Sequence, residues 1–93
     1  ITLHQSYAWA WNGKGLCHAA LNQWADALAC YQNAVEHDET DVWFWHNAGE
    51  AYLNLGNNDN AHAMFSHVLS LNSNHQPTLD KIQQINEKRD PND

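Results

Sequence analysis

The sequence predicts an all-α protein, an α-solenoid of two antiparallel helix pairs followed by one C-terminal helix. Residues of similar type recur at an interval of 34 positions along the chain. Within each interval the apolar residues are spaced by three or four positions, which places them on one face of a helix. We find no segment with the pattern of a β-strand. A fixed period of this length is typical of solenoids, in which each unit buries its apolar face against the next.

The repeat is clearest in two short segments. WNGKGLCH begins at Trp11, and WHNAGEAY begins at Trp45, 34 positions later. Other pairs at the same interval are Trp9 and Trp43, Gly15 and Gly49, His18 and Tyr52, Ala27 and Ala61, Tyr31 and Phe65, and Ala34 and Val68. Because many positions obey one interval, we expect two copies of one helical hairpin.

Helix boundaries follow from residues that begin or end helices. We expect helices over residues 7–21, 24–37, 42–55, 58–71 and 77–89. Ser6 is the expected cap of the first helix, because a hydroxyl can accept from the unpaired N–H groups there. Asn22 and Gly56 end the first helix of each pair, since Asn and Gly tolerate the left-handed backbone that closes a helix.

The remaining boundaries separate the two pairs and the last helix. Thr40 or Asp41 is expected to cap the third helix. Pro77 suits the first turn of the last helix, and Asp90-Pro91 ends it. The chain thus divides into a lead-in (1–7), a first repeat (8–41), a second repeat (42–75), a capping helix or partial third repeat (76–89) and a tail (90–93).

Large residues recur beside small ones within each hairpin. Gaps on the first helix of each pair come from Gly15 and Gly49, and small contacts on the second helix come from Ala27 and Ala61. The space beside them is filled by large side chains of the repeat signature: Trp11, Trp45, Tyr31, Phe65 and Tyr52. A Gly in a helix costs about 1 kcal/mol relative to Ala. Burying one aromatic ring contributes about 2–3 kcal/mol, so close packing of the two helices outweighs the cost.

These residues resemble the tetratricopeptide repeat, whose motif is W-x2-L-G-x2-Y followed by A-x3-F. This chain carries Trp11-x2-Lys14-Gly15-x2-His18 with Ala27-x3-Tyr31, then Trp45-x2-Ala48-Gly49-x2-Tyr52 with Ala61-x3-Phe65. The resemblance covers about residues 8–75. The departures from the motif are Lys14 and Ala48 for Leu, His18 for an aromatic residue, and Glu39 and Ser73 where Pro is frequent.

Two repeats are marginally stable alone. The chain begins with Ile, so we expect a segment of a longer protein. Either further repeats flank it, or homo-oligomer formation covers the exposed repeat ends.

The resemblance also implies a concave groove, lined by the first helix of each repeat, that binds a peptide or helix. Its positions here are Trp9, Asn12, Leu16 and Ala19, then Trp43, His46, Asn47, Glu50 and Leu53, then Pro77, Asp80 and Gln84. Trp9 and Trp43 are the main candidate anchors, since aromatic residues dominate many interfaces. Alternatively, both pack on a neighbouring repeat or on residues 1–7. Only Asn47 and Lys81 match the clamp that some family members use for a terminal carboxylate, so that mode is disfavoured.

Charge constrains the partner. Four Lys and Arg face eleven Asp and Glu, for a net charge of −7, and Lys14 is the single base in residues 1–80. Nucleic acid and anionic membranes are disfavoured because their phosphates would find no cations. No apolar run approaches the roughly 20 residues of a membrane span. The expected partner is another protein or peptide, apolar or basic.

We predict no catalytic residues, no metal site and no cofactor. His46 and Glu50 could share an ion, but a zinc site needs three or four ligands. Cys17 and His18 point about 100° apart on a helix and form no dyad. A Cys17–Cys30 disulfide is disfavoured, which weakly favours a reducing compartment such as the cytoplasm. Protonation of seven histidines would bring the net charge toward zero as pH falls through about 6.5, favouring lower solubility or tighter self-association near pH 5.5.

The sequence therefore predicts a protein–protein interaction module and not an enzyme. Two alternatives remain open: a structural segment that self-associates, and a segment that positions substrate within a larger enzyme.

Overall fold

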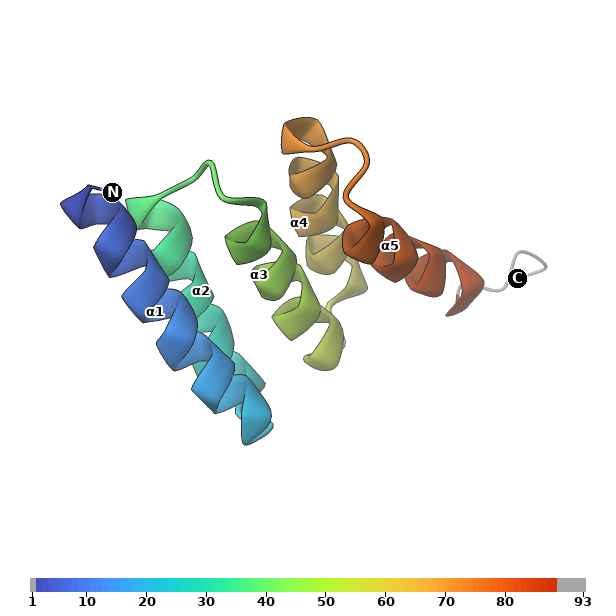
Figure 1. Ribbon diagram of the computed structural model, residues 1–93. Helices are drawn as coiled ribbons and strands as arrows, with labels where there is room; N and C mark the ends of the chain where they lie inside the picture. The colour runs from blue at the N-terminus through green and yellow to red at the C-terminus, as the bar shows by residue number, and fades with distance from the viewer. Residues whose placement is uncertain (1, 89–93) are drawn as a thin grey trace.

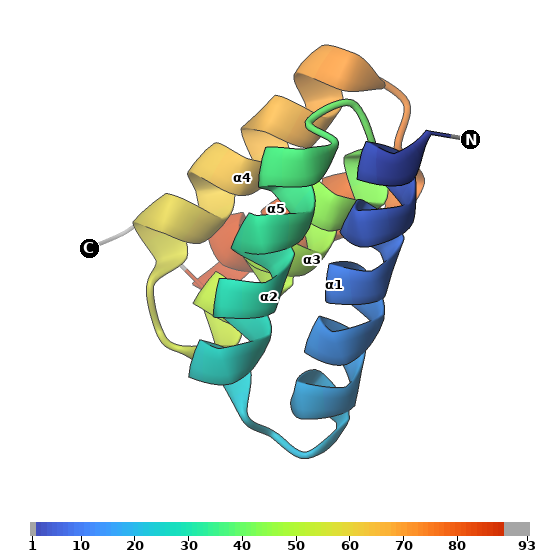
Figure 2. The same cartoon turned by 90° about the vertical axis from the view of Figure 1, so that its left-hand side faces the viewer.

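The computed structural model describes residues 2–88, which form five α-helices that follow one another in chain order along the molecule (Figure 1). The helices are α1 (Leu3–Ala20), α2 (Trp24–His37), α3 (Val42–Asn54), α4 (Asn58–Leu71) and α5 (Gln76–Lys88). Figure 2 shows α1 and α3 in one layer and α2 and α4 in the other. The stacked pairs give an elongated shape of 49 × 29 × 16 Å. The all-α solenoid of two helix pairs and a C-terminal helix is confirmed.

The expected start of the first helix is wrong. Residues 3–7 are helical and form the opening turns of α1. Thr2, not Ser6, is the cap: its hydroxyl accepts from the Gln5 N–H, and the Gln5 side chain accepts from the Thr2 N–H. This reciprocal capping box satisfies two backbone donors, whereas a lone Ser satisfies one.

The other boundaries lie within a residue of those expected. Asp41 caps α3 by accepting from the Trp43 N–H at 2.9 Å. Asn22 and Gly56 have φ of 59° and 80°, which confirms the left-handed conformation at equivalent turns. Leu55 closes α3 and is not helical. The expected helical residue 89 and the stop at 90–91 lie outside the described residues.

Helices within each pair approach most closely at a glycine. A methyl group in place of the Gly15 hydrogen would lie 2.6 Å from the Tyr31 ring. At Gly49 it would lie 2.5 Å from the Phe65 ring. Real side chains do not approach so closely, so the rings occupy space that only glycine leaves free. Tyr31 and Phe65 are almost wholly buried as a result.

Three buried clusters join the helices into one body. One joins Ala27 and Tyr31 of α2 to Ala48 and Ala51 of α3. A second joins Ala8, Ala34 and Phe44, and a third joins Ala61 and Phe65 to Ile85 of α5. The second cluster thus links α1 and α2 to α3, and the third links α4 to α5.

Candidate functional site

The candidate site is the outward face of α1, α3 and α5, which we call the leading-helix face. Its most exposed large apolar residues are Trp9, Leu16 and Trp43, with 47 %, 49 % and 45 % of their surface accessible. Side chains of this size usually bury most of their area in a folded domain. Their exposure on one layer of the solenoid makes this face the main candidate for binding.

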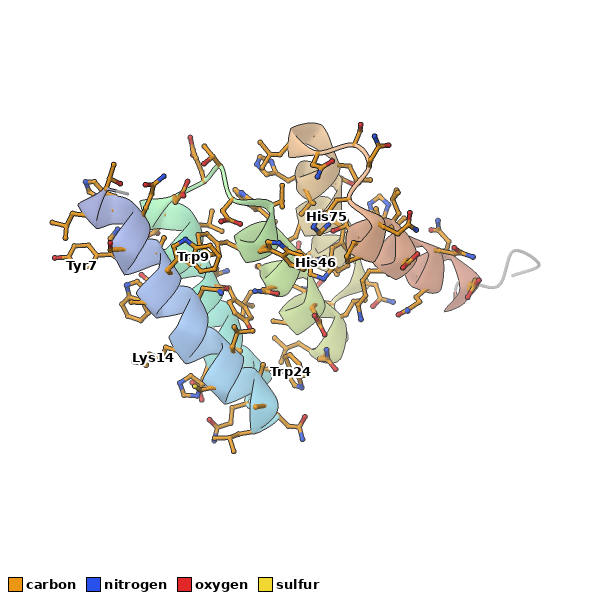
Figure 3. All side chains as sticks on the ribbon, in the orientation of Figure 1. Tyr7, Trp9, Lys14, Trp24, His46 and His75 are labelled. Atoms are coloured by element: carbon orange, nitrogen blue, oxygen red, sulfur yellow. The ribbon has the colours of Figure 1, made fainter. Side chains whose placement is uncertain are left out.

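Trp9 is exposed but held in place. Its ring meets the ring of Phe44 edge to face, with centroids 4.9 Å apart and planes at 76°. Phe44 is fully buried in α3, so it supports the Trp9 ring from below. Figure 3 shows Trp9 extending from α1 on the side of α3. The contact fixes one face of the indole and leaves the rest open to solvent.

Trp43 has equivalent support from two histidine rings. Its indole lies edge to face against His75 at 4.8 Å and against His46 at 5.5 Å. Figure 3 shows both histidines where α3 meets the start of α5. Edge-to-face geometry is favourable for aromatic rings at these separations. Trp43 therefore projects from α3 on a preformed aromatic base.

Two of the expected groove residues are buried in the structure. Asn12 is 4 % exposed and its side-chain oxygen accepts from the Asn47 side chain at 2.8 Å. His46 is also 4 % exposed. Both side chains form hydrogen bonds to neighbouring helices. They therefore help to position the leading-helix face and do not form its surface. Leu53 is half-buried against the third cluster, and Glu50 is partly exposed.

The environment of His46 differs from that of an ordinary surface histidine. Its Nδ1 lies 2.8 Å from the Thr78 hydroxyl, which bonds equally closely to Nδ1 of His75. Nε2 lies 4.0 Å from a Glu50 oxygen, and the other oxygen of Glu50 lies 3.9 Å from Lys81 Nζ. Burial, and then the nearby His75 and Lys81, lower the pKa of His46 from 6.5 to about 4. His46 therefore stays neutral where we had expected all seven histidines to gain protons.

Sequence reasoning missed this cluster. Thr78 is fully buried and His75 nearly so, although neither stands at a motif position that would mark it. His46 and Thr78 lie 32 positions apart. No local pattern predicts that separation as a contact.

The repeat-signature tryptophans sit in different surroundings. The Trp45 indole donates to the Glu39 carbonyl at 2.8 Å, and its ring contacts His67 with centroids 3.9 Å apart and planes tilted by 41°. Trp11 packs beside the second cluster, with Lys14 Nζ 5.2 Å from its ring centre. Trp45 thus lies between two helix pairs, whereas Trp11 lies at the outer end of the first.

Other reactive or ligating groups are dispersed. Within residues 2–88, no three His, Cys, Asp or Glu side chains converge in a way that would hold a metal ion. Cys17 is exposed, Cys30 is buried, and both are free thiols. In the same range no helix combines the length and apolar character needed to cross a bilayer.

Comparisons with known proteins agree with this architecture. Two tetratricopeptide repeat models match the chain, one over residues 8–41 and one over residues 30–63. Superkiller complex protein 3 from Mus musculus is 34 % identical over 77 residues, which are 83 % of this chain but 5 % of that protein. The first TPR of Spaghetti (RPAP3), solved bound to the HSP90 peptide SRMEEVD, superposes with a TM-score of 0.57 at 15 % identity, covering 94 % of this chain and 98 % of that one.

Proposed function

Because this segment is composed of tetratricopeptide repeats, we propose that its function is to bind an extended peptide or a helix of another protein on the leading-helix face. The structural neighbour in complex with a peptide supports a peptide partner. The match to a small part of a much longer protein supports a role as one module among others. The rest of such a protein would decide what the interaction achieves.

The observation that carries the proposal is the pair of half-exposed indoles at equivalent positions. Trp9 and Trp43 stand 34 positions apart, one on each leading helix. Each is fixed by ring contacts beneath it. A partner would therefore gain apolar contact without the entropy cost of ordering those side chains. Successive anchors on adjacent helices suit a ligand that runs across both repeats.

Charge on the same face favours an apolar partner with a basic residue. Glu50 and Asp80 are partly or fully exposed there. Lys81 is the base near them and is already paired with Glu50. An acidic peptide such as SRMEEVD would meet two carboxylates and one occupied ammonium. We expect this chain to discriminate against such acidic termini.

Peptide selection tests the proposal. Random peptides displayed on phage would be panned against the chain, and the recovered peptides measured by calorimetry with the parent and with Trp9→Ala/Trp43→Ala. Loss of two anchors should weaken binding by at least about 2 kcal/mol, or roughly 30-fold. Leu21→Ala is the matched control, because Leu21 is 68 % exposed at the turn between α1 and α2, away from this face. Equal affinity of the double variant and the parent would contradict the proposal.

A second candidate function, stacking on another repeat or another copy, follows from the outer side of α1. Tyr7, Ala10, Trp11 and Lys14 line a pocket there. The equivalent Trp45 lines a second pocket together with Gln32 and Val35 of α2 and Met64 of α4. A preceding helix would contact Trp11 as α2 contacts Trp45, since solenoid units bury their faces against neighbours.

Sedimentation equilibrium separates self-stacking from partner binding. If copies stack through this pocket, the mean mass should rise with concentration, and Trp11→Asp should restore the monomer mass because a carboxylate would be buried. A monomer mass at all concentrations would leave a flanking repeat as the occupant and rule out self-stacking.

A further inference from the structure

The cluster of His46, His75 and Thr78 joins three parts of the chain at the edge of the leading-helix face. His46 comes from α3, His75 from the connection after α4, and Thr78 from the first turns of α5. All three are less than 8 % exposed. The cluster is a buried polar link between α3 and the start of α5.

The hydroxyl of Thr78 makes two short hydrogen bonds that require particular protonation states. It lies 2.8 Å from Nδ1 of His46 and 2.8 Å from Nδ1 of His75. A hydroxyl has one proton to donate and lone pairs that accept. The arrangement is complete when the hydroxyl donates to one ring and accepts from the Nδ1–H of the other. The accepting ring must then be neutral, whereas the ring that donates its Nδ1–H can be neutral or protonated.

Protonation of both rings disturbs this arrangement in two ways. If both Nδ1 atoms carry protons, both donate to the hydroxyl, and the Thr78 proton loses its acceptor inside the protein. An unsatisfied buried donor costs about 1–3 kcal/mol. The two rings are also 5.7 Å apart, so two positive charges would repel at short range.

The surrounding charges do not compensate. Glu50 of α3 faces Nε2 of His46 at 4.0 Å, but it is partly exposed and shared with Lys81 of α5. Lys81 opposes a positive charge on His46. From α4 the ring of Phe65 faces His46 at 5.5 Å and carries no charge. The Glu50 carboxylate, which solvent screens, therefore favours a positive charge on His46, whereas burial, Lys81 and His75 all oppose it.

We infer that this cluster is a pH-sensitive latch: α5 is docked onto α3 while His46 is neutral, and acidification that protonates His46 releases the start of α5 and removes the support beneath Trp43. Its effect on partner binding rests on the proposed function, because Trp43 would lose its support as the latch opens. The latch itself concerns only α5 and is measured without a partner.

The direction of the effect follows from linkage. Burial lowers the pKa of His46 from 6.5 to about 4. A released ring would therefore take up a proton that the docked ring resists, so docking is strongest above pH 6.5 and weakens as the pH falls toward about 4. At about pH 5.5 the opening equilibrium of α5 should rise roughly tenfold.

Amide hydrogen exchange by NMR on the whole chain tests the latch. Protection factors for α5, corrected for intrinsic exchange, should fall roughly tenfold between about pH 7.5 and 5.5, while those of α1 and α2 stay constant. His46→Asn/His75→Asn keeps polar groups near the Nδ1 positions without titration and should abolish the fall. His62→Asn is the matched control, because His62 lies in α4 with its Nδ1 3.4 Å from the Ser66 hydroxyl, and it should behave as the parent does.

Three results would overturn the inference: α5 protection that does not change with pH, a fall of equal size in α1 and α2, or an unchanged fall in the double Asn variant. Should that double variant not fold, the ring resonances of His46 in the parent provide the second measurement. Proton uptake by His46 at pH 6.5 or above would equally overturn it, whereas uptake well below that pH supports it.

Discussion

The close approach at Gly49 can be tested by adding one methyl group. In Gly49→Ala the new Cβ would lie 2.5, 2.8 and 2.9 Å from three atoms of the Phe65 ring. Phe65 is fully buried against α5 and the rest of its cluster, so the ring has nowhere to move. Overpacking of this kind costs about 1–3 kcal/mol.

Gly13→Ala provides a matched control inside α1. A Cβ at Gly13 would have no heavy atom within 4 Å. Both substitutions gain the same helix propensity, about 1 kcal/mol, and they differ in the contact alone. Gly13→Ala should therefore stabilise the chain, and Gly49→Ala should be less stable than Gly13→Ala by about 1–3 kcal/mol.

Urea unfolding followed by circular dichroism measures the difference directly. In thermal unfolding of a domain of this size, a stability difference of about 2 kcal/mol corresponds to a difference in Tm of about 10 °C. Gly15→Ala should repeat the loss, since its Cβ would lie 2.6 Å from Tyr31. If Gly49→Ala proved as stable as Gly13→Ala, the packing argument for the glycines would be refuted.

Three further predictions concern the Asn12–Asn47 hydrogen bond, the buried Tyr31 phenol and the histidines. Asn47→Ala should lower the free energy of unfolding by about 1–3 kcal/mol, because the Asn12 side-chain oxygen would stay buried without its donor. The double variant Asn12→Ala/Asn47→Ala should lose less stability than the sum of the two single variants. Additive losses in urea unfolding would contradict a direct hydrogen bond. Burial, and then Glu50 and Cys30, raise the pKa of Tyr31 from 10.0 to about 12. The stability that this shift contributes is therefore present below about pH 10 and is lost as the pH rises toward about 12. The free energy of unfolding of Tyr31→Phe should fall less over that range than that of the parent, and identical alkaline profiles would contradict this. Histidine protonation should still favour self-association near pH 5.5, with a rising sedimentation coefficient as the expected result and an unchanged one as the contrary result.

The helices could be predicted because their signals are local. The bounds of α2 and α4 match the expected ranges, since breakers at Asn22 and Gly56 recur with the repeat. The start of α1 was predicted too late in the chain, because Ser6 is the hydroxyl residue next to the repeat motif. The stronger capping box at Thr2 and Gln5 precedes the motif.

The candidate face was harder to predict because it depends on distances between helices. Motif counting assigns Asn12 and His46 to one side of their helices, and that side also contacts the neighbouring helix. Whether such a residue is covered depends on how closely the helices stack and on polar partners about 32–35 positions away. Trp9 and Trp43 are large enough to extend past that contact and stay accessible.

The most direct test of the proposed function is chemical-shift mapping with a selected peptide. Amides and indole N–H groups around Trp9, Leu16 and Trp43 should shift on titration, and those on the outer sides of α2 and α4 should not. Shifts confined to α2 and α4, with both indole signals unmoved at saturation, would contradict binding on the leading-helix face.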